Sequence, residues 1–229
     1  MKSPLRSIIH VFICGLAVCT LASCGAVPDR QQTSRSAQRP QAAIPAEPSQ
    51  ELKSCLADLG ATGARYSALP DRYYAPGCHT LGSVQLAGLA GDSGQIGLAN
   101  IGPVTCETAK TLAGWARYGV DRAARYYLGS QVVRIDTMGS YSCRQVSGTT
   151  RLSAHSRAEA IDVSGLLLAD GRRIIVTEDW EDGTRAEREF LRAIHRSACK
   201  RFATVLGPDY NADHRDHFHV EGQGPVFCR

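Results

Sequence analysis

The spacing of apolar residues predicts an amphipathic helix near the middle of the chain. Thr105 can cap a helix that runs to about Tyr118, and Gly119 is expected to stop it. Its apolar face repeats every three or four residues and consists of Ala109, Leu112, Ala113 and Ala116. A second, short helix is expected to follow and to end at Leu128.

The same spacing predicts a longer helix over residues 186–202, closer to the C-terminus. One face of this helix carries Phe190, Leu191, Ile194 and Ala198. His195 falls outside that set. We therefore expect its side chain to point to solvent.

Shorter segments rich in β-branched residues predict strands. Residues 131–136 indicate one strand, and residues 166–169 and 172–176 flank Asp170-Gly171, which is a strong hairpin signal. Helices and strands together predict an α+β fold, with a small antiparallel sheet flanked by helices.

A continuous apolar run over residues 8–21 lies behind Lys2 and Arg6. The run is short for a membrane span and has the form of a signal peptide. It ends in Leu21-Ala-Ser-Cys24, which is similar to the bacterial lipoprotein cleavage box. This similarity implies removal of residues 1–23 and attachment of lipid, such as palmitate, to Cys24. An ordinary cleaved signal with a chance cysteine is the alternative.

The lipid anchor implies a place in the bacterial cell envelope, facing the periplasm. Gly25 follows the cysteine, and the absence of an aspartate there favours the outer membrane. Residues 24–50 are rich in Gln, Ser, Arg, Ala and Pro, which predicts a flexible tether with a span on the order of 30 Å. Residues 51–229 are enough for one domain with a well-formed core.

Cysteine usage agrees with an oxidising compartment. Of the nine cysteines, two lie in the signal segment and Cys24 takes lipid. The remaining even set consists of Cys55, Cys78, Cys106, Cys143, Cys199 and Cys228. We expect three disulfides between neighbours along the chain, pairing the first with the second, the third with the fourth and the fifth with the sixth. The alternative is a zinc site made of cysteines, but the sequence contains no C-x-x-C pair.

Histidine and aspartate concentrate in His155-Ser-Arg-Ala-Glu-Ala-Ile-Asp162 and Asp213-His-Arg-Asp-His-Phe-His219. A catalytic zinc ion takes three nitrogen or carboxylate ligands and leaves one position to water. We expect His155 in a loop and Asp162 on a strand. On a second strand, His217 and His219 should point to one face and Phe218 to the other. The alternative is that each segment is a solvated, hydrogen-bonded turn.

The pattern H-x6-D followed by H-x-H resembles the zinc peptidases grouped with lysostaphin, the D-alanyl-D-alanine peptidases and the hedgehog amino-terminal domain. More narrowly, residues 51–229 resemble the bacterial extensin-like C-terminal domain family. The segments that carry this resemblance are Ser140-Tyr-Ser-Cys-Arg144, Leu152-Ser-Ala-His155, Ala160-Ile-Asp162, Ala169-Asp-Gly171, Phe190-Leu191 and His214-x-x-His217-x-His219. By that resemblance, His155, Asp162 and His219 would hold Zn²⁺. Ala158-Glu159 departs from the pattern, because related chains often carry glycine at the first of these positions.

The resemblance also implies roles for residues around the metal. His217 would be the general base or the transition-state proton donor. Asp216 is the alternative candidate for this role. His214 has the spacing of an additional active-site histidine found in murein endopeptidases. Arg144 would hold a substrate carboxylate or the developing oxyanion; the alternative is a surface arginine that happens to follow a cysteine.

Charge narrows the choice of partner. The formal net charge is +4, and nothing in the sequence demands nucleic acid. Arginines cluster in sequence around the two histidine-bearing segments, and a mildly basic cleft suits an anionic, carboxylate-bearing polymer. Most of these arginines are expected to lie on solvent-exposed faces of helices and hairpins.

Three functions fit these observations. The first is zinc-dependent hydrolysis of peptide bonds in the stem or cross-bridge peptides of peptidoglycan. The second is a binding module that recognises the cell wall without cutting it. The third is a structural lipoprotein stabilised by disulfides, which the intact ligand set argues against.

Overall fold

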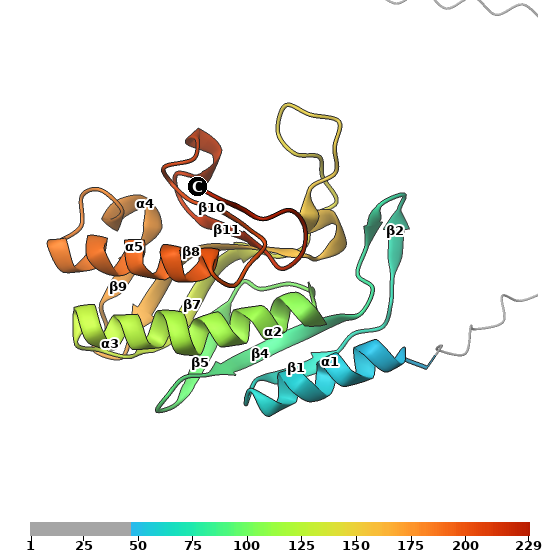
Figure 1. The fold of residues 1–229 in the computed structure, drawn as a ribbon, viewed down its shortest axis with the longest axis horizontal. Coiled ribbons are helices and arrows are strands. Elements are labelled where there is room, and N and C mark those ends of the chain that lie inside the picture. The colour runs from blue at the N-terminus through green and yellow to red at the C-terminus, as the bar shows by residue number, and fades with distance from the viewer. Residues whose placement is uncertain (1–46) are drawn as a thin grey trace, which may run out of the picture. The chain divides into compact units, whose positions relative to one another are not determined.

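The computed structural model describes residues 47–229 (Figure 1). Its helices are α1 (Gln50–Ala61), α2 (Cys106–Trp115), α3 (Arg122–Leu128), α4 (Val176–Asp179) and α5 (Arg185–Cys199), with the π-helical turn η1 (Ala116–Asp121) and the 3-10 turns η2 (Ala154–Arg157) and η3 (Ala212–His214). Its strands are β1 (Arg65–Ala68), β2 (Tyr73–Ala75), β3 (Cys78–His79), β4 (Ser83–Ala90), β5 (Gln95–Ala99), β6 (Val104–Thr105), β7 (Val132–Gly139), β8 (Ala160–Leu168), β9 (Arg173–Ile175), β10 (Thr204–Leu206), β11 (Phe218–Glu221) and β12 (Phe227–Cys228). The predicted signal peptide, Cys24 and most of the predicted tether lie outside the described residues.

The α+β class is confirmed, but the predicted small antiparallel sheet is wrong. One 10-stranded sheet has the order β1-β4-β5-β7-β8-β11-β10-β12, with β6 beside β4 and β9 beside β8. The sheet is mixed, because β5 pairs with β7 and β10 with β12 in parallel. Between β5 and β7 the chain passes through α2, η1 and α3, and a long crossover of this kind permits parallel pairing where a tight turn does not.

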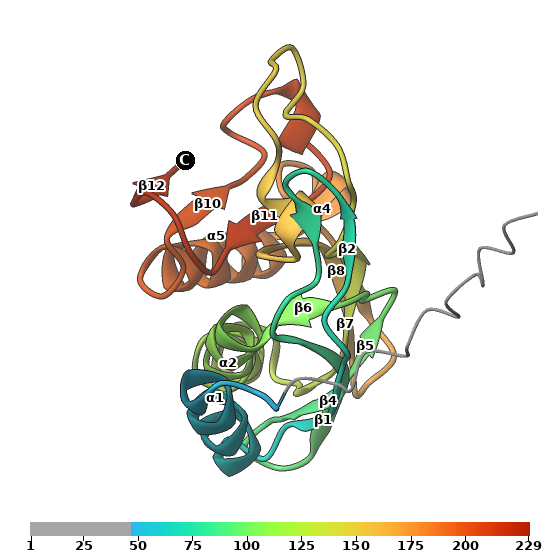
Figure 2. The ribbon, with the colours of Figure 1, turned by 90° about the vertical axis from the view of Figure 1, so that its right-hand side faces the viewer.

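The long helices α1, α2 and α5 cover one face of the sheet (Figures 1 and 2). Their apolar sides and the facing side of the sheet form one core. Trp115 is fully buried in it and donates a hydrogen bond from its Nε1 to the Ile194 carbonyl at 3.0 Å. No helix among residues 47–229 is long and apolar enough to cross a membrane.

The predicted helix stop at Gly119 is wrong, because the helical segment continues through η1 into α3. A Cβ atom at Gly119 would collide with Ser197 of α5 and with Trp115. The glycine therefore allows α5 to approach closely. The stop comes at Gly129, whose φ of 69° lies in the left-handed region that glycine adopts without strain.

The helix predicted over residues 186–202 is confirmed as α5, with an end at Cys199. Thr184 and Glu187 form a capping box at its start, and the predicted apolar face is buried. The prediction for His195 is wrong. Its ring is partly buried against Trp180 and Phe218, with ring centroids 5.8 and 5.4 Å away, and burial lowers its pKa.

The predicted hairpin is confirmed, since β8 and β9 pair in antiparallel fashion around Asp170 and Gly171. Gly171 has the positive φ, 88°, that such a turn requires. The strand predicted over residues 131–136 is confirmed as β7, which begins at Val132 and extends to Gly139.

The three disulfides exist, but only one of the predicted pairs is correct. Cys199–Cys228 is confirmed, whereas the other two bonds are Cys55–Cys106 and Cys78–Cys143. Helix α1 packs on α2, which brings Cys55 to the start of α2, and the hairpin of β2 and β3 lies beside the loop after β7. Tertiary packing therefore overrides nearness along the chain.

Candidate metal centre

Two adjacent strands position the first two candidate ligands. Strands β8 and β11 pair in a register that sets Asp162 directly opposite His219. Phe218 points to the other face, where it is fully buried, so the predicted alternation is confirmed. The placement of Asp162 on a strand is confirmed as well.

His155 reaches the same place from η2, a short 3-10 turn just before β8, where a loop was expected. Ser153 caps the turn, and Ala158 ends it with a φ of 56° in the left-handed region. This is the position at which related chains often carry glycine. The alanine keeps the same backbone shape at a cost on the order of 1 kcal/mol.

The three side chains converge on one point. His155 Nε2 lies 3.2 Å from His219 Nδ1 and 3.1 Å from the Asp162 carboxylate. His219 Nδ1 lies 2.8 Å from Asp162 Oδ1. All three residues are buried.

This donor set fits a zinc ion. Ligand atoms about 2.0 to 2.1 Å from a tetrahedral zinc lie about 3.3 Å apart, close to the separations among these three atoms. Two imidazoles and one carboxylate also match the usual composition of an open zinc site. His155, Asp162 and His219 are thus a candidate metal centre.

The outer nitrogens of both histidines are fixed by hydrogen bonds. His155 Nδ1 donates to the Ser140 carbonyl at 3.2 Å, which leaves Nε2 to face the centre. His219 Nε2 donates to Glu221 Oε1 at 2.9 Å, which leaves Nδ1 inward. Hydrogen bonds of this kind orient metal-binding histidines and raise their basicity.

His217 stands next to the three candidate ligands and is held from behind. Its Nδ1 donates to Asp216 Oδ1 at 2.8 Å, and its Nε2 lies 3.5 Å from Asp162 Oδ1. The Asp216 side chain is half exposed on the far side of the ring. Asp216 is therefore placed to orient His217, while Nε2 of His217 faces the metal centre.

A second group of donor atoms overlaps the first. The imidazole nitrogens of His214, His217 and His219 also lie within 4.8 Å of one another. Nδ1 of His214 is engaged by Asn211 Oδ1 at 2.6 Å. The group lacks a carboxylate, and Nδ1 of His217 is tied to Asp216, so it suits a metal ion less well than the first group.

The charges in the cluster are strongly coupled. Burial raises the pKa of the Asp162 carboxyl, but hydrogen bonds from His155 and His219 outweigh burial and hold it well below its usual range. Burial lowers the pKa of His219, whereas the hydrogen bonds to Asp162 and Glu221 raise it to about 9. Burial and the neighbouring histidines lower the pKa of His214 to about 4. A metal ion binding here would replace the proton on His219 Nδ1.

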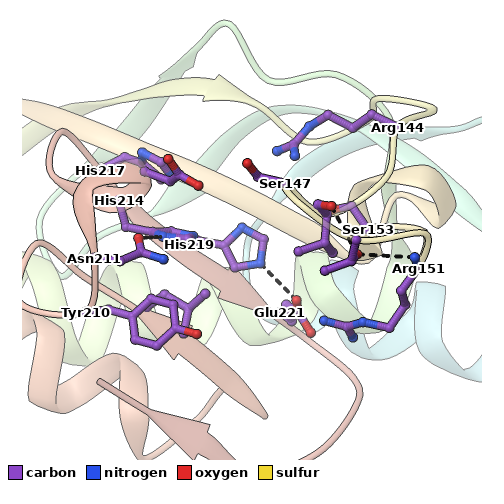
Figure 3. Close-up of a pocket in the computed structure, with 14 residues that line it drawn as sticks. Arg144, Ser147, Arg151, Ser153, Tyr210, Asn211, His214, His217, His219 and Glu221 are labelled. Atoms are coloured by element: carbon purple, nitrogen blue, oxygen red, sulfur yellow. Dashed lines mark hydrogen bonds and ion pairs between the residues drawn. The ribbon is translucent and has the colours of Figure 1, made fainter.

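A cavity of about 470 Å³ opens beside the cluster (Figure 3). One wall belongs to the C-terminal segment, and the opposite wall to the loop that joins β7 to η2. The labelled residues of the first wall are Tyr210, Asn211, His214 and His217, and those of the second are Arg144, Ser147, Arg151 and Ser153. His219 and Glu221 lie between the two walls.

A smaller cavity of about 180 Å³ reaches the cluster from another side, where His155 and Asp162 line it. Arg144 lines both cavities, as its predicted role requires. Within residues 47–229, its guanidinium forms no hydrogen bond or ion pair. Asp216 lines neither of these two cavities.

The structure thus brings together His155, Asp162, His219, His217 and His214. Sequence reasoning missed Glu221 and Ser140. Glu221 carried a usable signal, because a residue two positions after His219 on a strand points to the same face. Ser140 acts through its backbone carbonyl, for which no side-chain signal exists.

Comparison with known proteins supports the narrower of the two resemblances seen in the sequence, that to the extensin-like family. Neither a curated protein nor a solved structure matches the chain. The family model for the extensin-like protein C-terminus matches residues 53–229. This range spans nearly all of the described fold and every residue of the candidate metal centre. The chain therefore belongs to the extensin-like protein C-terminus family.

Proposed function

We propose that the protein is a zinc-dependent hydrolase of peptide bonds in the stem or cross-bridge peptides of peptidoglycan. The observation that carries this proposal is the convergence of His155, Asp162 and His219 on one point that two cavities reach, one lined by His219 and the other by His155 and Asp162. Beside them stands a histidine that is paired with a carboxylate. This combination of open metal centre and poised imidazole is what hydrolytic zinc enzymes require, and the resemblance to zinc peptidases points the same way.

Each residue around the centre has a role in this proposal. Zinc held by the three ligands would polarise a peptide carbonyl and lower the pKa of its water towards ~7. His217 accepts a proton of the attacking water at Nε2 and later donates it to the leaving amine. Asp216 accepts the Nδ1 hydrogen of His217 and so fixes the tautomer in which Nε2 is free.

Arg144 and His214 complete the site. The Arg144 guanidinium, which forms no ion pair among residues 47–229, holds a substrate carboxylate or the developing oxyanion. His214, whose pKa is lowered to about 4, stays neutral at physiological pH and can donate or accept a hydrogen bond in the cavity.

The proposed location is the periplasmic side of the bacterial envelope, with lipid on Cys24. Three disulfides in the domain support an oxidising compartment. Peptidoglycan lies within reach of a tethered domain there.

Digestion of purified peptidoglycan, with mass analysis of the released muropeptides and metal content measured on the same preparation, tests the function. The zinc-loaded protein should release products whose masses identify the bond that is cut. The alternative is a binding module that keeps the metal without turnover. Cosedimentation with peptidoglycan but no products over long incubation would replace the hydrolase with that module.

A further inference from the structure

The cavity beside the metal centre carries opposite charges on its two walls. Arg144 and Arg151 line the wall formed by the loop after β7 (Figure 3). Asp213 lines the cavity from η3, the turn that also carries His214 on the opposite wall. Glu221 lies at the floor and is already bonded to His219.

Arg151 lines the cavity with a guanidinium that has no partner among residues 47–229, as Arg144 does. Arg117, Arg134 and Arg172 each pair with an aspartate, whereas the Arg151 guanidinium forms no ion pair or hydrogen bond among residues 47–229. Asp213 likewise has no ion-pair partner in that range. A cation and an anion that line one cavity without pairing are available to a ligand.

The backbone around Arg151 is well fixed. The Val146 amide donates to the Arg151 carbonyl at 2.8 Å, and the Ser153 amide donates to the Arg144 carbonyl at 3.0 Å. These bonds fold the loop into a hairpin, on which Arg144 and Arg151 occupy opposite arms. Figure 3 shows the two guanidiniums at separate places on this wall, so they can bind two different groups of a ligand.

We propose that the cavity selects a peptide segment that carries a carboxylate and a primary amine on one side chain. The inference rests on the proposed function and names its substrate class. Arg144 binds a carboxylate or the developing oxyanion at the reacting part of the peptide. Arg151 binds the side-chain carboxylate, and Asp213 binds the side-chain ammonium group. The hydroxyls of Ser147, Thr149 and Ser153 line the cavity and offer further hydrogen bonds to such a polar chain.

A pair of matched peptides provides the test. One stem peptide contains a residue of 2,6-diaminoheptanedioic acid, whose side chain ends in a carbon with both an amine and a carboxylate. The other contains lysine, which has the amine without the carboxylate. Affinity is measured by calorimetry on the zinc-loaded full chain with His217→Ala, so that binding is observed without turnover, and kcat/KM is measured on the chain with His217.

The parent should prefer the diamino dicarboxylic peptide by about tenfold, the effect of one partly exposed charge-assisted contact. Arg151→Gln should reduce this preference to less than about twofold and leave the lysine peptide unchanged. Asp213→Asn should weaken both peptides about fivefold, and acetylation of the side-chain amine should remove the effect of that variant. Arg196→Gln and Asp182→Asn, on exposed residues outside the cavity, are the matched controls.

The outcomes separate the two proposals. Equal affinity of the parent for the two peptides, or an equal loss of both with Arg151→Gln, overturns the selectivity. A preference in binding with no hydrolysis of either peptide leaves the selectivity intact and overturns the hydrolase. Hydrolysis of both peptides at the same kcat/KM supports the hydrolase and overturns the selectivity.

Discussion

Asp162 is the residue that organises the candidate metal centre. Its two oxygens face three imidazoles, with His219 Nδ1 at 2.8 Å, His155 Nε2 at 3.1 Å and His217 Nε2 at 3.5 Å. A carboxylate in such surroundings stays ionised despite its burial, which is the state that a metal ligand must have. The overlapping group of three histidines contains no such anion.

Substitutions can separate the two overlapping groups. His155→Ala and Asp162→Ala should each abolish the binding of about one zinc ion per chain, because each removes one of three ligands. His214→Ala and His217→Ala should keep the zinc, because neither residue belongs to the preferred set. Metal content after dialysis, measured by plasma emission spectroscopy, distinguishes them. The opposite pattern, in which zinc is lost only with His214→Ala and His217→Ala, would contradict the assignment.

A second prediction concerns the proton carrier. His217→Ala should keep zinc and lose about 10² to 10⁴ in kcat, the usual contribution of general acid–base catalysis. Asp216→Asn should cost less, because Asp216 only orients the His217 ring. Steady-state kinetics on muropeptides provides the measurement. A larger loss with Asp216→Asn than with His217→Ala would make Asp216 the proton carrier.

The third prediction is a pH dependence of zinc affinity. The pKa of His219 is about 9, so below that pH zinc must displace a proton from the ring. The apparent association constant should therefore rise about tenfold per pH unit from pH 6.5 to 8.5. Competition with a chromophoric chelator at three pH values measures the slope. Glu221→Gln removes one cause of the raised pKa and should make the slope shallower, whereas a flat profile in the parent would contradict the prediction.

At the residue scale, the two histidine-bearing segments singled out in the sequence do meet in space. His155, Asp162, His217 and His219 all carry their chemistry in the side chain, and strand alternation accounts for the orientation of Asp162 on β8 and His219 on β11. The Ser140 carbonyl could not be found in this way, because any residue supplies such a group. His195 was misplaced, since its surroundings come from Trp180 and Phe218, which are distant in sequence.

At the element scale, the cavity depends on how the loop after β7 is held. Cys78–Cys143 ties the base of the loop to β3, and the Leu152 side chain packs against Gly77. A Cβ atom at Gly77 would meet Leu152, and its φ of 75° also favours glycine. The wall that carries Arg144 is thus anchored on the hairpin of β2 and β3.

The fourth prediction tests this anchorage. Cys78→Ser with Cys143→Ser should destabilise the domain by roughly 2 to 5 kcal/mol and lower kcat/KM of the folded fraction. Zinc content should stay near one ion, because the ligands come from η2, β8 and β11. Cys55→Ser with Cys106→Ser is the control, since that bond joins α1 to α2 and spans a similar length of chain. Equal losses of kcat/KM in both double variants would show that the anchorage has no specific role.

Local signals predicted elements better than they predicted how those elements pack. The capping box of α5 and the Asp170-Gly171 turn act within a few residues, and both were found. Gly119 has the sequence signature of a helix stop, yet it serves the close approach of α5. Disulfide connectivity and the parallel pairing of β5 with β7 depend on packing between segments far apart in the chain, which no local pattern encodes.

At the scale of the whole molecule, the architecture separates stability from function. Helices α1, α2 and α5 cover one face of the sheet and complete the core, whereas the metal centre and its cavity are built from β8, β11 and the loops beside them (Figures 2 and 3). The proposed substrate is an insoluble polymer, so the location of the domain matters as much as its chemistry. A lipid-anchored tether on the order of 30 Å long would keep the cavity close to the wall.

The fifth prediction concerns the lipid anchor at Cys24. Cys24→Ala removes the thiol that the cleavage box Leu21-Ala-Ser-Cys24 offers for lipid, so incorporation of radiolabelled palmitate should be abolished. Acyl chains supply the membrane affinity of a lipoprotein. Without them, the mature chain should be released from the membrane, or the signal peptide should stay uncleaved. Ser23→Ala keeps the cysteine and a small residue before it, and should still incorporate label. The candidate ligands His155, Asp162 and His219 are unchanged in this variant, so zinc content and kcat/KM on soluble muropeptides should match the parent, while digestion of the wall in cells should fall. Unchanged palmitate incorporation in Cys24→Ala would contradict the lipoprotein assignment and leave the proposed chemistry of the domain standing.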